Sequence, residues 1–233
     1  MKNTKLKFLL DIKRKKNKMA KKKITKGLTH INFVLDETGS MSNIEHEVMT
    51  GFNKYIDDLK ADGDELYRFS LLKFDSTKLE QVYDDVLPSI VNHLDNKSYR
   101  PGAMTPLYDA ISHSLRNIED KVKSGDKVLT VIFTDGQENS SKEMTLDKLK
   151  TMMKDKETLG WAFMYLGVAV DAWSQVNNFI GTTTASNFLN TSGAAGVSAA
   201  YSTATIARQR YSGGNTTLDS LVTDEDRKNA AGK

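Results

Sequence analysis

The chain alternates between short apolar runs and longer stretches in which apolar residues recur at helical spacing. Runs rich in strand-forming residues, each four to eight residues long as buried strands are, stand at 28–35, 67–74, 128–133 and 161–166. A polar turn at 75–77 and a further run at 79–83 predict a hairpin after the second strand. The pattern therefore predicts at least five strands, two of them antiparallel neighbours.

Helices are predicted between these runs. The apolar stripe of the first helix consists of Ile44, Val48, Phe52, Tyr55, Ile56 and Leu59. Ser42 and Glu45 fit a capping box that would start this helix, and the polar stretch 61–64 would end it. Pro106 suits the first position of a second helix that would run to Gly125, and Thr145 would start a third.

Weaker patterns occupy the last quarter of the chain. They predict a short helix at 171–180, an edge strand at 185–189 and a last helix at 193–210 that is rich in Gly, Ala and Ser. This last helix would pack closely, either as a fixed or as a mobile element.

Strands that alternate with helices indicate a doubly wound α/β fold, with a mostly parallel sheet, one antiparallel edge strand and helices on both faces. The chain of 233 residues fits one such domain, which we place at 28–210. Residues 1–27 form a basic N-terminal arm and residues 211–233 a polar C-terminal tail. Both segments are too polar to build a core, and we expect them to be disordered.

Charge is distributed unevenly between the arm and the rest. Residues 1–26 contain twelve basic residues and one acidic residue, a net charge of +11, whereas the remainder has 21 basic and 29 acidic residues, a net of −8. Such an arm binds nucleic acid or an anionic surface in some proteins and is merely solvated in others; we expect the second. A translation start at Met19 would remove eight of these basic residues.

Cysteine is absent, which excludes disulfides, thiolate zinc sites and a cysteine nucleophile. The apolar stretch at 8–10 is shorter than the ~7–15 residues of a signal peptide core, and no run approaches the ~18 residues that span a membrane. We therefore expect a cytoplasmic protein without a membrane partner. The lysine-rich composition suits a bacterial or bacteriophage origin.

Polar side chains follow two of the predicted parallel strands. Asp36, Thr38 and Ser40 come after the first strand, and Asp135 comes after the strand at 128–133. Thr105 lies in the loop before the second helix. In doubly wound sheets, ligands bind beyond the carboxyl ends of the strands, near the point where strand order reverses. We therefore expect these side chains to meet at one edge of the sheet.

Two carboxylates and three hydroxyls are ligands that suit a hard cation, and Mg²⁺ commonly takes one or two carboxylates and keeps several waters. Alternating spacing allows the first three side chains to point the same way, and Gly39 would permit the tight turn between them. The sequence predicts a Mg²⁺ site, with Mn²⁺ as an alternative ion, whose ligands are Asp36, Thr38, Ser40, Thr105 and Asp135. Glu37 is expected to be exposed beside it, and Asp109 to interact with a helix N-terminus.

Three separated motifs carry a resemblance to a known family. The sequences DETGSM at 36–41, TPLYDA at 105–110 and TDG at 134–136 resemble the metal-ion-dependent adhesion site of von Willebrand factor A domains, over roughly residues 28–190. The resemblance implies that Thr38, Ser40 and Thr105 coordinate directly or through water, and that Asp36 and Asp135 do so directly or through a bridging water. Thr38 departs from the family, which more often has Ser there, but it retains the hydroxyl.

The resemblance also implies a function. In this family an acidic side chain of a partner protein commonly fills an open coordination position on the metal, so the chain would be a protein-binding module rather than an enzyme. Intracellular members often act beside an ATPase or within a multi-protein assembly, which is the class of partner we expect.

Other chemistries have less support in the sequence. A phosphate-binding G-x-x-x-x-G-K-[ST] loop, a G-x-G-x-x-G turn after a strand and a G-x-S-x-G elbow are all absent, and the four histidines lack zinc-like spacing. A metal-dependent hydrolase is an alternative, although the obvious carboxylates are already assigned as ligands. A nucleic-acid-associated scaffold that uses the basic arm is another.

Overall fold

The computed structural model of the protein describes residues 27–135, 138–168, 188–191, 193–214 and 221–230. The basic arm at 1–26 and the helix expected at 171–180 lie outside these residues, as does most of the strand expected at 185–189. No helix in the part that is described is long and apolar enough to cross a membrane.

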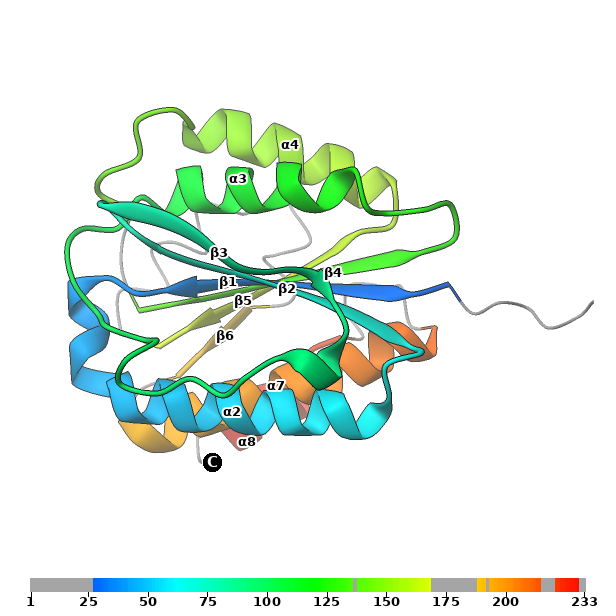
Figure 1. The fold of residues 1–233 in the computed structure, drawn as a ribbon, viewed down its shortest axis with the longest axis horizontal. Helices are drawn as coiled ribbons and strands as arrows, with labels where there is room; N and C mark the ends of the chain where they lie inside the picture. Colours follow the sequence, from blue (N-terminus) through cyan, green and yellow to red (C-terminus); the bar gives the residue numbers. More distant parts are fainter. Residues whose placement is uncertain (1–26, 136–137, 169–187, 192, 215–220, 231–233) are drawn as a thin grey trace, which may run out of the picture.

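A six-stranded sheet forms the centre of the fold, with the strand order β3-β2-β1-β4-β5-β6 (Figure 1). The strands are β1 (Thr29–Asp36), β2 (Tyr67–Asp75), β3 (Lys78–Val86), β4 (Lys127–Thr134), β5 (Ala162–Gly167) and β6 (Phe188–Asn190). All neighbouring strands are parallel except β2 and β3, which form an antiparallel hairpin. The doubly wound sheet with one antiparallel edge strand is thereby confirmed.

Helices cover both faces of this sheet, as Figure 1 shows. One face carries α3 (Leu107–Glu119) and α4 (Leu146–Thr158), and the other carries α2 (Glu45–Asp62), α7 (Gly193–Gly213) and α8 (Asp224–Ala230). Two short 3₁₀ helices, η1 (Gly39–Ile44) and η2 (Pro88–Ile90), lie in the loops. The chain therefore has three layers, with a core on each side of the sheet.

The two cores follow from the alternation of side chains along the strands. In β1, Ile31, Phe33 and Leu35 belong to the cluster under α2 and α7, whereas Val34 belongs to the cluster under α3 and α4. The ring of Phe33 lies 5.6 Å from that of Phe52 in an edge-to-face arrangement. The apolar stripe predicted for the first helix therefore faces the sheet as expected.

Strand order reverses between β1 and β4. The chain leaves β1 to form β2 on one side, and it returns through α3 to form β4 on the other side. A point of this kind is where doubly wound sheets bind ligands. Because β1 ends at Asp36 and β4 ends at Thr134, the polar residues that follow these strands lie at this point.

Two expected helix ends are wrong. The chain forms η1 directly after Thr38, so Ser42 lies inside η1 and the predicted capping box does not form; the N-cap of α2 is Ile44, without a side-chain hydrogen bond. Helix α3 ends at Glu119, before the predicted Gly125. In contrast, Thr145 caps α4 as expected, since its side chain accepts a hydrogen bond from the Lys148 amide.

The expectation of disorder after residue 211 is wrong for 221–230. Leu221 and Val222 are buried in the cluster under α2 and α7. Thr223 and Asp226 form a capping box for α8: the Asp226 amide donates to the Thr223 hydroxyl at 3.2 Å, and the Thr223 amide donates to the Asp226 carboxylate at 2.8 Å. Arg210 of α7 pairs with Asp226. Two apolar residues and one cap are therefore enough to attach this segment.

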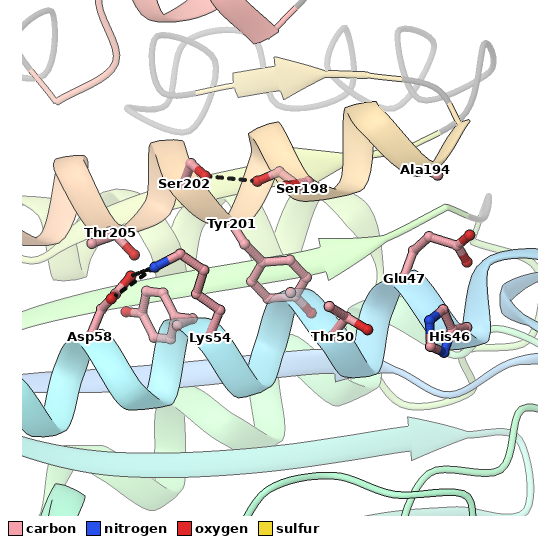
Figure 2. A pocket seen from close by; sticks show the side chains of 12 residues that line it. His46, Glu47, Thr50, Lys54, Asp58, Ala194, Ser198, Tyr201, Ser202 and Thr205 are labelled. Carbon is pink, nitrogen blue, oxygen red and sulfur yellow. Dashed lines mark hydrogen bonds and ion pairs between the residues drawn. The ribbon is translucent and has the colours of Figure 1, made fainter.

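The predicted last helix is confirmed as α7, and it packs closely against α2. A Cβ atom at Gly51 of α2 would lie only 2.2 Å from Cδ2 of Tyr201, so glycine allows this ring to reach the sheet. Beside this contact lies a cavity of about 340 Å³ that both helices line; Figure 2 shows its side chains, including Tyr201 and the Lys54–Asp58 ion pair.

Candidate metal centre

Asp36, the last residue of β1, has no exposed surface. One carboxylate oxygen accepts the Thr38 amide at 2.7 Å, and the other accepts the Thr134 hydroxyl of the neighbouring strand β4. Burial raises the pKa of Asp36 to about 7, although the hydrogen bonds from Thr134 and Thr38 oppose this shift and the charge of Asp135 adds to it. None of the ion pairs among the described residues includes Asp36.

Asp135 follows β4 and faces Asp36 across the point where strand order reverses. Its Oδ1 accepts a hydrogen bond from the Ser40 hydroxyl at 2.7 Å, and the Ser40 oxygen lies 3.4 Å from the Thr38 hydroxyl. Partial burial raises the pKa of Asp135 above its ordinary value, against the hydrogen bond from Ser40. Asp36, Thr38, Ser40 and Asp135 thus form one continuous hydrogen-bonded group.

Thr105, the fifth predicted ligand, is buried in the loop before α3. That loop is joined to the first motif, because the Gly39 amide donates to the Ala103 carbonyl at 3.1 Å. Asn139 holds Thr105 with two hydrogen bonds. Its side-chain Oδ1 accepts the Thr105 backbone amide at 2.8 Å, and its backbone amide donates to the Thr105 carbonyl at 3.1 Å. The structure therefore brings four predicted ligands into contact and places the fifth on the adjoining loop.

The expectation that Glu37 is exposed is wrong, because the structure buries it completely. Its carboxylate lies 3.2 Å from Nζ of Lys73 and 2.8 Å from Nζ of Lys78, and it accepts the Arg100 amide at 2.6 Å. This cluster ties the loop before α3 to the ends of β1 and β2. The signal for it is Lys73 itself, a charged residue between Leu72 and Phe74 in a strand expected to be buried, which needs a partner when buried.

Gly39 is needed for a reason other than the expected one, and Asp109 has a role beyond the expected one. Gly39 does not adopt a left-handed backbone; instead, a Cβ atom there would lie 3.3 Å from the Ala103 carbonyl, so the close loop approach favours glycine. Asp109 lies in the first turn of α3 as expected, and its carboxylate also accepts the backbone amides of Lys142, Glu143 and Met144. It thereby fastens the loop that precedes α4.

We call the group formed by Asp36, Thr38, Ser40, Thr105 and Asp135 the rim. Three residues that support the rim were not predicted from the sequence. Thr134 donates to Asp36, Asn139 holds Thr105, and the Tyr99 hydroxyl donates to the Asp36 carbonyl at 2.7 Å. Thr134 stood within the TDG motif, so its role could have been suspected. Tyr99 and Asn139 act across 63 and 34 residues of sequence, and no local pattern marks them.

The chemistry of the rim fits a hard cation held partly through water. Within the described ranges, no three His, Asp or Glu side chains are grouped so as to hold a metal ion. The rim instead offers two carboxylates and three hydroxyls. Mg²⁺ sites in proteins typically use one or two carboxylates with water, so this set of residues suits Mg²⁺.

The chain belongs to the von Willebrand factor type A domain family, which matches residues 30–201. Domains of this family are generally protein-interaction modules. No curated protein matches the chain.

Several solved structures share the fold at low sequence identity. The vWF domain of the type V pili tip protein Mfa5 from Porphyromonas gingivalis aligns with a TM-score of 0.59 and 10% identity, over 77% of this chain and 94% of that one. The PilB minor pilin from Streptococcus sanguinis aligns with a TM-score of 0.60 and 12% identity, over 80% and 61%. Proximal thread matrix protein 1 from the mussel byssus aligns with a TM-score of 0.57 and 11% identity, over 77% and 47%, so this chain spans about half its length.

Another structure of the mussel protein has a zinc-occupied MIDAS motif, where MIDAS stands for metal-ion-dependent adhesion site. It aligns with a TM-score of 0.50 and 14% identity, over 72% of this chain and 42% of that one. At these identities the likeness concerns the fold alone.

Proposed function

We propose that the chain is a divalent-cation-dependent protein-binding module. Asp36, Thr38, Ser40, Thr105 and Asp135 would hold one Mg²⁺, or Mn²⁺ in its place, and an acidic side chain of a partner protein would complete its coordination. An ATPase or another component of a multi-protein assembly is the class of partner that we propose.

The observation that carries this proposal is the pair of carboxylates at the point where strand order reverses. Asp36 and Asp135 are linked through Thr38 and Ser40, and neither carboxylate forms an ion pair with a Lys or Arg of the described residues. Two carboxylates of this kind disfavour each other's charge, and burial increases the cost. A divalent cation would remove both effects, which is why we infer that one binds here.

Each residue would contribute in a specific way. The hydroxyls of Thr38 and Ser40 already lie 3.4 Å apart and beside the Asp135 carboxylate, so small rotations would turn their oxygens toward one ion. Asn139 keeps the backbone of Thr105 in place. The ion would supply positive charge at an edge where a partner's carboxylate can approach, because Gly39 and Ser40 are exposed. The zinc-occupied MIDAS motif of the mussel protein supports the idea that this fold can hold a metal.

Calorimetric titration of Mg²⁺ and Mn²⁺ into chelator-treated protein tests the proposal. We expect saturable binding to the wild-type chain and none to Asp36→Ala or Asp135→Ala, with folding of each variant checked by circular dichroism. Asp155→Ala, which removes an exposed carboxylate on α4, is the matched control and should bind as the wild type does. Folded wild-type protein that binds neither ion, or equal binding by both rim variants, would contradict the proposal.

A further inference from the structure

A second cavity lies immediately beside the candidate metal centre. It has a volume of about 430 Å³ and lies between the β2–β3 hairpin and the loop at 92–100. Glu37, which follows Asp36 in the chain, forms part of its wall. The Glu37 carbonyl also accepts the Gly102 amide at 2.9 Å, so the wall of this cavity and the rim share one backbone. We call this cavity the basic pocket.

The basic pocket has an excess of positive charge. Its walls include the four cations Lys73, Lys78, Lys97 and Arg100, against two carboxylates, Glu37 and Glu80. The whole chain after residue 26, the pocket included, has a net charge of −8, so this local excess is opposite in sign to the body that carries it. An anionic group approaching the protein is therefore favoured here over most of its surroundings.

The cations of the pocket differ in what they already bind. Lys73 is 4% exposed and lies within 3.2 Å of both Glu37 and Glu80, and Lys78 contacts the same two carboxylates. Lys97 and Arg100 are exposed, and neither forms an ion pair with any acidic side chain of the described residues. The Arg100 side chain donates through Nε to the Asn96 carbonyl at 3.3 Å, and its two terminal nitrogens have no hydrogen-bond partner among the described residues. Lys97 and Arg100 are thus available to a ligand, beside the ion-paired Lys73 and Lys78.

The loop between the pocket and the rim limits how far apart they are. Arg100 and Thr105 are five residues apart, and a fully extended chain of that length spans at most about 18 Å. Between them stands Met104, whose side chain is 56% exposed and whose backbone is held by Ser76 through two hydrogen bonds of 2.9 and 3.1 Å. An exposed, flexible apolar side chain thus lies on the loop that joins the basic pocket to Thr105.

We propose that the basic pocket binds a second acidic side chain of the same partner protein, in an extended segment whose first acidic side chain reaches the metal. This assignment rests on the proposed function. The two acidic residues would stand within roughly six positions of each other, since the backbones of Arg100 and Thr105 lie at most about 18 Å apart. Met104 would contact an apolar residue between them. Arg100 and Lys97 would thereby determine which acidic segments bind.

Fluorescence anisotropy with labelled hexaglutamate as the probe tests this assignment, in Mg²⁺ at low salt. We expect the pair of substitutions Lys97→Gln and Arg100→Gln to weaken binding at least about tenfold. The matched control is the pair Lys148→Gln and Lys154→Gln, which removes the same charge from exposed positions of α4. It should change the affinity less than about twofold. Equal weakening by both pairs would overturn the assignment, because it would reflect net charge alone.

Two further arms separate this inference from the proposed function. Loss of hexaglutamate binding in chelator and in Asp135→Ala, without any effect of the pocket pair, would overturn the pocket and leave the metal-dependent module standing. Binding that depends on the pocket pair but ignores Mg²⁺ would support the pocket and contradict the metal. Labelled oligothymidylate that binds as tightly as hexaglutamate, with the same dependence on Lys97 and Arg100, would overturn the assignment to an acidic protein segment.

Discussion

Asp36 and Glu37 are adjacent carboxylates, both fully buried, in opposite electrostatic environments. Glu37 lies against Lys73 and Lys78 and accepts a backbone amide, so its charge is compensated inside the protein. Asp36 receives hydrogen bonds from Thr134 and Thr38 but forms no ion pair within the described residues, and burial raises its pKa to about 7. The chain thus provides lysines for Glu37, whereas Asp36 has no ion-pair partner among the described residues and, with Asp135, is where we propose that a cation binds.

Strand geometry explains how neighbours can differ so much. Successive side chains leave a strand in opposite directions. Glu37 enters the basic pocket beside β2, whereas Asp36 points toward β4, where Thr134 and Asp135 lie. Glu37 therefore stabilises the loop that carries Thr105. The buried, charged form of Asp36 lowers the stability of the fold, at a place suited to binding.

The largest expected effect comes from removing Lys73, the buried one of the two lysines that contact Glu37. Lys73→Met leaves a buried carboxylate with one exposed partner, and we expect a loss of about 3 kcal/mol in the free energy of unfolding. Urea denaturation measures it. Lys78→Met is the matched control: its side chain is 40% exposed, so we expect a loss below about 1 kcal/mol. Combining Lys73→Met with Glu37→Gln should recover most of the loss, and equal losses from both lysines would break the comparison.

Neutralising Asp36 should increase the free energy of unfolding, whereas removing Lys73 should lower it. Its folded-state pKa of about 7 exceeds the ordinary value of 3.8, so the charged form costs folded stability progressively as pH rises between these values, and the cost is complete above them. In chelator at pH 8, Asp36→Asn should therefore stabilise the protein, on the order of 2 kcal/mol, and near pH 4 the gain should vanish. Thermal unfolding at both pH values measures this. Destabilisation at pH 8 would show that Asp36 is compensated after all.

A smaller effect is expected at the residue that holds Thr105. Asn139→Ala removes the acceptor for the Thr105 amide, and we expect a loss of about 1 kcal/mol in unfolding free energy. Mg²⁺ affinity should fall, because Thr105 would no longer be fixed, and calorimetry measures this. Asn96→Ala removes another exposed amide side chain and should leave both quantities unchanged. Unaltered affinity in Asn139→Ala would exclude Thr105 as a ligand that must be positioned.

Ser40→Ala should affect folding least. The side chain is exposed and its hydroxyl donates only to Asp135, so the free energy of unfolding should change by less than about 0.5 kcal/mol. Affinity for Mg²⁺ should nevertheless fall by about tenfold or more. A variant that is both as stable and as competent in metal binding as the wild type would remove Ser40 from the ligand set.

Much of the fold could be predicted from the sequence. Apolar periodicity located β1, β2, β4, β5, α2 and α4 within a few residues, because each element buries a face or a stripe that the period reveals. The end of the chain was misjudged, since Leu221 and Val222 are two isolated apolar residues and no periodicity marks them. Their burial depends on the surface that α2 and α7 form only after folding.

For the candidate site, some features could be predicted from the sequence and others could not. Side chains that directly follow β1 and β4 could be grouped, because parallel strands end at one edge. The environment of Glu37 could not be derived, since Lys73, Lys78 and Arg100 come from three other segments. Whether a carboxylate is buried depends on partners far away in sequence. The polar residues around Glu37 therefore led to the wrong prediction that it is exposed.

Diffraction from crystals grown with Mn²⁺, collected at a wavelength where manganese scatters anomalously, tests the central claim most directly. The account predicts one strong anomalous peak at the end of β1, within coordination distance of the Ser40 and Thr38 hydroxyls and joined to Asp36, Asp135 and Thr105 directly or through water. A fully occupied peak elsewhere, or none at the rim at saturating Mn²⁺, would contradict it.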